Sequence, residues 1–435
     1  MLKLGLTEYW RKIANRYIDR QVLVLLLTAA ICISVGGCGS GGAASTNSTP
    51  STDSAPSIPE FTASPDNEIA FVSVRPLNGT DAPPPTNCGR GGCTTGDANI
   101  WVMHADGSNQ TPLTQLTVVE NDSPVWSPDG STILFQSPRA LDGSDANVNN
   151  VFNLWRMNSD GSSALPLTRF TVDAFNRNFL QVWSPNGTRI AYVSVGALDG
   201  SNATGTNSNI WIMNADGSNP TPLTKYSLPP QPSIAAPSAF LPAWSPDGSK
   251  IVYSSNGSLD GSNAVNGSGN IWVMSADGSN ASPLTKFTAP PQQPGAGATG
   301  AKWSPDGTKI AYSSNGALDG SNAANVNGAG NIWIMNGDGS NPIPITHSTN
   351  AFATIGTSTG GWSPDGKKLI VVCTCALDGS NNANNTANIW VMNADGSART
   401  PLTQSTNSNV KTEGPTWSLD GTKIFFDSNR ALLIS

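Results

Sequence analysis

Five aspartates recur at equivalent places in the chain, each in a loop that opens with Leu-Asp-Gly-Ser. Their carboxylates, with Asn78 in the same place in an earlier copy, are oxygen ligands that could bind Ca²⁺ weakly or hydrogen-bond a glycan. Asp-Gly pairs also form turns, and no copy has the acidic density of an EF-hand loop. We therefore favour the turn interpretation and expect no cofactor or metal, with weak calcium as the alternative. The five are Asp142, Asp199, Asp260, Asp319 and Asp378.

Histidine, a frequent general acid or base, is scarce, because the chain has only two. His104 stands in a hairpin turn where other copies have Asn, and His347 follows a predicted fourth strand. Spacing identifies no partner for either, so both are interpreted as solvated turn residues. The GxSxG match "GTSTG", Gly356 to Gly360, lacks the following helix that a nucleophile elbow requires. The sequence thus predicts no catalytic residues and favours a protein that is not an enzyme.

The cysteines fit an exported protein. Cys88 and Cys93 bracket "GRGG" in a long loop and are predicted to form a small disulfide. Cys373 and Cys375 are two apart on one face of a predicted strand, where a direct bond would be strained, and no firm pairing is assigned to them. The C-x2-C spacing typical of a four-cysteine zinc site is absent from the sequence.

Two phrases alternate along the chain and must position these loops. A hairpin phrase built on "WSPDG" occurs seven times, with Ala63 replacing Trp in a degenerate first copy. A second phrase, commonly "NIWVMNADGS" followed by "TPLT", occurs six times. The repetition predicts an architecture of stacked units. The tryptophans of the first phrase are Trp126, Trp183, Trp244, Trp303, Trp362 and Trp417, and those of the second are Trp101, Trp155, Trp211, Trp272, Trp333 and Trp390.

Each unit is predicted to contain four short strands, such as "PVWS", "TILFQS", "NLWRMN" and "LPLT" between Pro124 and Thr168. S-P-D-G and A-D-G-S turns join the first strand to the second and the third to the fourth. Proline recurs in the fourth strand and at times in the first, so these two should be the edges of the sheet. The apolar run "IWVM" predicts a third strand covered on both faces.

Four-stranded sheets repeated in this way predict an all-β propeller. Seven blades are favoured, with "ALLIS", Ala431 to Ser435, as the third strand of the last blade and the segment before Phe61 as its outer strand. A six-bladed ring with a spare hairpin is the main rival. The tight turns should project from one face and the variable, aspartate-bearing loops from the other.

The phrases "WSPDG-KIAYSSN" and "NIWVMNADGSN-PLT" resemble the TolB-like β-propeller repeat, a WD40-like module of bacterial envelope proteins. The resemblance covers about Phe61 to the C-terminus and implies a propeller over residues 58–435. The chain departs from TolB before the propeller, where TolB has an α/β domain and this sequence is expected to have a lipobox and a tether instead.

The first 37 residues are typical of an export signal: five basic residues, the apolar run from Val22 to Val35, then small residues. The alternative is a signal-anchor that is never cleaved. Val35 to Cys38 resembles the lipobox of bacterial lipoproteins, which implies a signal peptide at 1–37, lipidation of Cys38 and attachment to the outer membrane. Residues 38–57, rich in Ser, Thr, Gly and Pro, are predicted to be a flexible tether. The chain is expected on the periplasmic side of that membrane or at the cell surface.

The net charge of −7 argues against nucleic acid as a partner. We expect a lipid-anchored module of the cell envelope that binds or scaffolds a protein partner through its loop-rich face. The alternative is a carbohydrate-binding protein, or a hydrolase or lyase with a carboxylate site at the channel mouth.

Overall fold

The computed structural model describes a chain built of β-strands. Every element of regular structure among the described residues is a strand, so the all-β expectation is confirmed. The described residues are 21–26, 68–73, 99–104, 108–116, 121–141, 143, 151–171, 181–196, 204–227, 237–261, 265–288, 296–317, 329–348, 355–356, 361–373, 388–405 and 412–428.

Five sheets have four antiparallel strands, each in sequence order from one edge to the other. The first two contain β5 (Asp122–Trp126), β6 (Thr132–Ser137), β7 (Asn153–Asn158) and β8 (Leu165–Pro166), then β9 (Val182–Trp183), β10 (Arg189–Gly196), β11 (Thr204–Asn214) and β12 (Thr221–Pro222). The next two contain β13 (Ala239–Trp244), β14 (Lys250–Gly257), β15 (Val265–Ser275) and β16 (Ser282–Pro283), then β17 (Ala298–Trp303), β18 (Lys309–Ser314), β19 (Asn331–Asn336) and β20 (Ile343–Pro344). The fifth contains β21 (Ile355–Gly356), β22 (Lys368–Cys373), β23 (Asn388–Asn393) and β24 (Thr400–Pro401).

Two further sheets have three described strands each. One joins β2 (Glu68–Ser73), β3 (Asn99–His104) and β4 (Thr111–Pro112). The other places β26 (Lys423–Ser428) between β25 (Thr412–Trp417) and β1 (Gln21–Leu26). Seven complete four-stranded blades are therefore not shown. The rival prediction, six blades with an additional hairpin, lies closer to these sheets, because the last one is the hairpin β25–β26 with β1 beside it.

The strand expected beside β26 was Ala431 to Ser435. In the structure the neighbour of β26 is β1, with Gln21 opposite Ser428 and Leu26 opposite Lys423. The two segments expected to complete this sheet, Ala431 to Ser435 and the one before Phe61, lie outside the described residues. An apolar segment near the start of the chain thus takes the position beside β26 that was predicted for the last residues of the chain.

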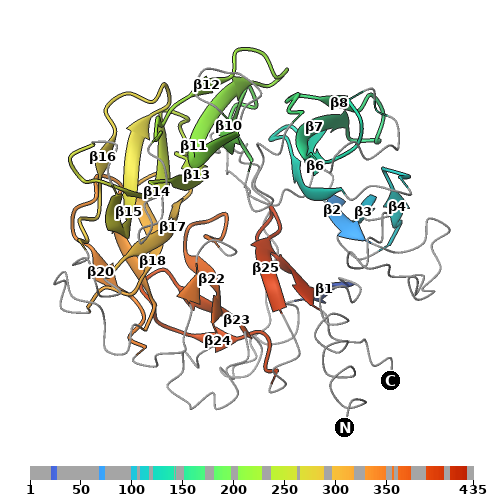
Figure 1. Cartoon of the computed structure of the whole chain (residues 1–435). Helices are drawn as coiled ribbons and strands as arrows, with labels where there is room; N and C mark the ends of the chain where they lie inside the picture. Colours follow the sequence, from blue (N-terminus) through green and yellow to red (C-terminus); the bar gives the residue numbers. More distant parts are fainter. Residues whose placement is uncertain are drawn as a thin grey trace, which may run out of the picture.

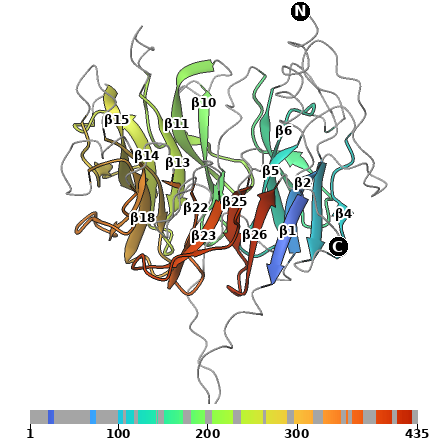
Figure 2. The same ribbon diagram turned by 90° about the horizontal axis from the view of Figure 1, so that it is seen from below.

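The sheets follow one another around a ring in chain order (Figures 1 and 2). The first strands, such as β13 and β25, lie toward the centre, and the fourth strands, such as β12 and β16, lie outside (Figure 1). Phe425 of the last sheet packs with Ile69 and Met103 of the first, so the two ends of the ring are in contact. The β-propeller fold is confirmed.

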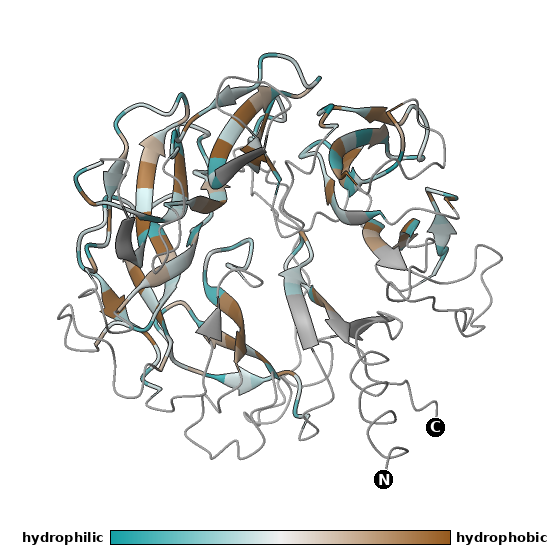
Figure 3. Cartoon of the chain, viewed as in Figure 1, coloured by the Kyte–Doolittle hydropathy of each residue, from teal (hydrophilic) through white to brown (hydrophobic). Residues whose placement is uncertain are grey.

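The third strands are apolar on both faces because each sheet is packed between two others. Ile271, Trp272 and Met274 of β15 are all buried, as the sequence predicted for this strand. Trp272 lies opposite Tyr253 in the register, and the two rings stack with centroids 6.3 Å apart. Figure 3 shows the apolar residues concentrated on such inner strands. Tryptophan thus serves as packing material between sheets.

Proline marks the outer edges, as expected. Each fourth strand pairs over two residues only, as with Pro222 opposite Trp211 and Thr221 opposite Ile212. Because proline has no N–H to donate, this strand can end a sheet without leaving an unpaired donor. The strand orders confirm that the first and fourth strands are the edges.

Candidate functional site

The connections between second and third strands carry the predicted site, and two of them stand above their sheets. The hairpins β10–β11 and β14–β15 continue past a bulge, with Gly196 opposite Thr204 and Gly257 opposite Val265. These two sheets are neighbours in the ring (Figure 1). The same strand order in every sheet places equivalent connections on one face, the loop-rich face, and the tight turns on the other.

The aspartate-bearing loops begin with short turns. The Gly143 N–H donates to the Ala140 carbonyl at 2.8 Å, and the Gly261 N–H donates to the Ser258 carbonyl at 3.0 Å. Gly261 has φ +75°, a conformation that favours glycine. Asp260 occupies the position before it and is exposed. Asp142, Asp199, Asp319 and Asp378 lie outside the described residues, so their assembly into one mouth stays a prediction.

A leucine fixes the base of each described turn. Leu259 packs against the core between the third and fourth sheets of the chain, and Leu141 packs against the core that contains Phe135 and Trp155. In Leu-Asp-Gly the leucine therefore points into the protein while the adjacent Asp260 is presented to solvent. The recurring Leu makes these turns rigid starting points for the variable loops.

An asparagine–threonine clamp fixes the other end of the same loops. The Asn270 Oδ1 accepts from the Phe287 N–H at 2.8 Å and from the Thr285 hydroxyl at 3.0 Å, while its Nδ2 donates to the Phe287 carbonyl at 2.9 Å. The Ile271 N–H donates to the Thr285 Oγ1 at 2.9 Å. The buried amide continues the ladder that the short fourth strand leaves unfinished. It thereby anchors the points where the second-to-third loop enters the sheet and the fourth strand leaves it.

Sequence reasoning did not single out this clamp. The signal that could have found it is the constant Asn two positions before the Trp of the second phrase, with a constant Thr fifteen positions after that Asn, in all six copies. Each Asn Oδ1 accepts from the Thr hydroxyl in every copy. The asparagines are Asn99, Asn153, Asn209, Asn270, Asn331 and Asn388.

Carboxylates on the tight-turn face are occupied by their own turns. The Asp247 Oδ1 accepts from the Ser245 hydroxyl at 2.6 Å and from the Ser249 N–H at 3.0 Å. These bonds stabilise the charged form and hold the pKa of Asp247 below its ordinary value. Asn186 makes the same contacts in the one turn that reads "SPNG". Equivalent aspartates with lowered pKa are Asp129, Asp306, Asp365 and Asp420.

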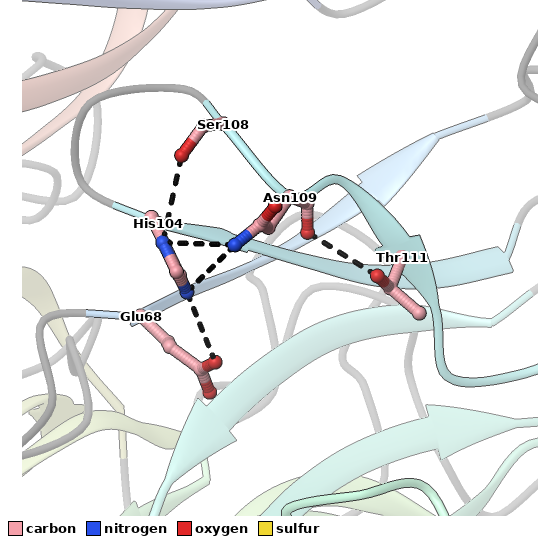
Figure 4. A network of polar contacts seen from close by, with 5 residues as sticks. All are labelled: Glu68, His104, Ser108, Asn109 and Thr111. Atoms are coloured by element: carbon pink, nitrogen blue, oxygen red, sulfur yellow. Dashed lines mark hydrogen bonds and ion pairs between the residues drawn. The ribbon is translucent and has the colours of Figure 1, made fainter.

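A polar network surrounds His104 (Figure 4), which ends β3 just before the tight turn to β4 and therefore lies on the tight-turn face. His104 Nε2 is 3.9 Å from Glu68 Oε1, and His104 Nδ1 is 3.5 Å from Ser108 Oγ. Asn109 Nδ2 lies 3.2 Å from Nδ1 and 3.3 Å from Nε2. The imidazole is half exposed, at 46% of its side-chain surface. His347 is exposed as well.

The contact of His104 with Ser108 replaces a structural contact made in other copies. Asn158 Nδ2 donates to the Ser162 hydroxyl at 2.9 Å, and Asn214 does the same to Ser218. A serine in a recurring turn bond, 3.5 Å from an exposed imidazole, lacks the short hydrogen bond that activates a nucleophile. The geometry agrees with the interpretation of His104 as a solvated turn residue.

A buried arginine distinguishes the second unit from its neighbours at the loop-rich end. The Arg139 guanidinium lies 5.0 Å from the Phe135 ring centroid and 4.6 Å from that of Trp155. Three later copies have glycine at this place, where an aromatic ring of the preceding unit packs: Phe170 at Gly196, Tyr226 at Gly257 and Phe287 at Gly316. The unit preceding Arg139 has the smaller Leu116 instead. At these four places, the space is therefore filled either by a ring of the preceding unit or by the arginine.

Other predicted sites are only partly described. Cys373 is buried and disulfide-bonded, and its partner lies outside the described residues, as do Cys38, Cys88, Cys93 and Cys375. Among the described residues no three His, Cys, Asp or Glu side chains gather as metal ligands would. The described part of the chain holds no helix of the length and hydropathy needed to cross a membrane.

The chain was compared with known proteins. No family model matches it. An uncharacterized protein of Agrobacterium fabrum is 30% identical over 155 residues, which make up 36% of this chain and 46% of that protein. The chain thus spans about half the length of the curated relative it matches.

Solved structures match over much more of the chain. An oligogalacturonate lyase of Vibrio parahaemolyticus matches 94% of this chain and 97% of its own, at 11% identity and a TM-score of 0.51. TolB of Acinetobacter baumannii matches 76% of this chain and 75% of its own, at 14% identity and a TM-score of 0.41. The likeness is one of fold. It agrees with the β-propeller that the repeat predicted.

Proposed function

We propose that the chain is a lipid-anchored binding module of the bacterial cell envelope that holds a protein partner on its loop-rich face. The observation that carries this proposal is the contrast between the two faces. On the tight-turn face, the aspartates of the recurring turns bond inside those same turns. On the loop-rich face, rigid Leu and Asn anchors present loops whose sequences differ from copy to copy.

Such an arrangement suits recognition of a macromolecule. A rigid scaffold that carries variable loops loses little conformational entropy on binding. The two tall hairpins β10–β11 and β14–β15 provide neighbouring raised edges on this face. The negative charge of the chain favours a partner with basic or neutral patches.

The test compares two exposed aspartates in one sheet but on opposite faces. The chain is immobilised and envelope extract is passed over it, and the retained protein is identified and then purified for titration. Asp260→Arg, on the loop-rich face, is expected to weaken binding at least tenfold, whereas Asp277→Arg, on the tight-turn face, should change it less than twofold. Equal losses, or a loss only with Asp277→Arg, would contradict the proposal.

The anchor is tested separately through Cys38. Cys38→Ala is expected to move the protein from the membrane fraction to the soluble envelope fraction, because the acyl chains attach to that sulfur. Cys88→Ala is the control and should leave the protein with the membranes. If Cys38→Ala stays in the membrane fraction, the chain is held there by other means.

A glycan is the second candidate ligand, favoured by the likeness to an oligogalacturonate lyase over nearly the whole of both chains. The acidic loops would then hydrogen-bond sugar hydroxyls directly or through Ca²⁺. Titration with oligogalacturonate, with and without calcium, tests this idea. Binding that is lost in Asp199→Ala and Asp319→Ala would favour the glycan over the protein partner, and release of unsaturated products would indicate a lyase.

A further inference from the structure

The last sheet uses a strand that export processing would remove. β26 has β25 on one side and β1 on the other, paired over all six residues from Gln21 opposite Ser428 to Leu26 opposite Lys423. β1 belongs to the apolar run of the export signal predicted at residues 1–37. Removal of that segment would leave one edge of β26 without its partner strand.

Both faces of this sheet are covered by other sheets. Ile424 and Phe426 pack with Ile370 of the preceding sheet, whereas Phe425 points the other way and packs with Ile69 of the first sheet. A strand placed beside β26 therefore needs apolar side chains on both faces, like the "IWVM" strands of other sheets. An open edge here would expose a row of N–H and C=O groups close to the seam of the ring.

The segment Ala431 to Ser435 meets these requirements. Its sequence, "ALLIS", is apolar on both faces of a strand, as is "VLVLL" in β1. Only Asn429 and Arg430 separate it from the end of β26, and two residues suffice for an antiparallel hairpin. Direct attachment gives it a far higher effective concentration at this edge than a separate chain has.

We propose that the free edge of β26 has two alternative occupants, β1 in the unprocessed chain and Ala431–Ser435 in the processed one. Cleavage of the signal thus exchanges one strand for another and keeps the last sheet at three strands. The inference rests on the processing step in the proposed function and is independent of any partner on the loop-rich face.

Amide hydrogen exchange in β26 tests whether Ala431–Ser435 replaces β1 after processing. Two forms are compared: the full chain made without export, and the processed chain from envelopes, whose N-terminus is read by mass spectrometry. Leu433→Pro removes a donor and interrupts a strand. In the processed chain it should speed exchange of the β26 amides that face away from β25 at least tenfold, and in the full chain less than twofold.

The full chain supplies matched controls. Val24→Pro alone should also have less than a twofold effect, because Ala431–Ser435 can take the edge, whereas Val24→Pro with Leu433→Pro should expose it. If Leu433→Pro prevents folding of the processed chain, Leu433→Ser, which retains the N–H, should give the same direction with a smaller change.

Several outcomes would overturn the inference. One is rapid exchange of these amides in the unsubstituted processed chain, which would leave the edge for another protein or a second copy. Another is an equal effect of Leu433→Pro in both forms. If mass spectrometry finds residues 1–37 in the envelope protein, the predicted processing fails, and with it the premise of the exchange. Loss of protection in a properly processed chain would instead contradict this inference alone.

Discussion

The junction between two interior sheets differs from the junction that closes the ring. Between the β9–β12 and β13–β16 sheets, Val182, Ala191, Trp244, Ile251 and Tyr253 belong to one large buried cluster. At the closing junction, the buried cluster of described residues consists of Ile69, Met103 and Phe425. Among the described residues, the buried cluster between the two interior sheets is therefore larger than the cluster at the closing junction.

The largest expected loss of stability comes from shortening an isoleucine that occupies an equivalent position at each junction. Ile251 and Ile69 occupy equivalent places in their second strands, opposite Met274 and Met103. Ile251→Ala should lower the free energy of unfolding by about 4 kcal/mol and Ile69→Ala by about 2 kcal/mol, because the larger cluster cannot collapse around the cavity as easily. Urea unfolding of both variants measures the difference. Equal losses would mean that the seam is as well packed as the interior.

Removal of a clamp should give a smaller effect that is the same in both regions. Asn270→Ala and Asn99→Ala each leave the backbone N–H of a loop residue, Phe287 or Leu116, without its acceptor. Each is expected to cost about 2 kcal/mol. Urea titration measures both losses. A loss of unfolding free energy for Asn99→Ala well below that for Asn270→Ala would show that the first sheet itself is less stable than the interior sheets.

Two glycines differ in the space that a Cβ atom would have, and substituting them tests how tightly the sheets pack around each. A Cβ at Gly316 would lie 2.7 Å from the Phe287 ring, whereas one at Gly361 would meet nothing within 4 Å. Gly316→Ala should therefore cost about 1.5 kcal/mol by displacing the ring, and Gly361→Ala should be nearly neutral. Thermal unfolding of the two variants provides the measurement. A neutral Gly316→Ala would indicate that the ring moves aside without cost.

The smallest effect concerns acid stability and compares two interior turns. The pKa of Asp247 is lowered on folding from 3.8, so its contribution is present above about that pH and is lost as the pH falls through the lower folded value. Asp247→Asn should slightly reduce stability at pH 7 and flatten its fall between pH 4 and 2. Asn186→Asp should do the reverse in the "SPNG" turn. Unfolding midpoints across this range decide, and an unchanged pH profile for both would contradict the assignment.

Most of the repeated architecture could be predicted from the sequence. Proline in the fourth strand and the apolar "IWVM" run identified edge and inner strands, because a missing N–H and a two-sided apolar surface each allow one position in a sheet. The turn interpretation of Leu-Asp-Gly likewise agrees with the hydrogen bond of Gly261 to Ser258. These features depend on local chemistry that a short phrase contains.

Features that depend on contacts between distant segments were harder to predict. The pairing of β1 with β26 joins residues about four hundred positions apart, and both "VLVLL" and "ALLIS" satisfy the same local pattern. Arg139 resembles an ordinary surface residue in the sequence, and only the structure shows its guanidinium over the Trp155 ring. The Asn–Thr clamp was visible as a constant spacing, but its role appears only when the fourth strand is seen to stop after two paired residues.

The brevity of those outermost strands has a consequence for crowding. When molecules collide edge to edge at high concentration, a long exposed strand allows them to pair and to join into fibres. Here the outer edge of a sheet is a two-residue strand such as Thr-Pro, and not an extended row of backbone donors. Neighbouring propellers therefore lack a long edge strand for pairing here, and at high concentration they should remain separate molecules.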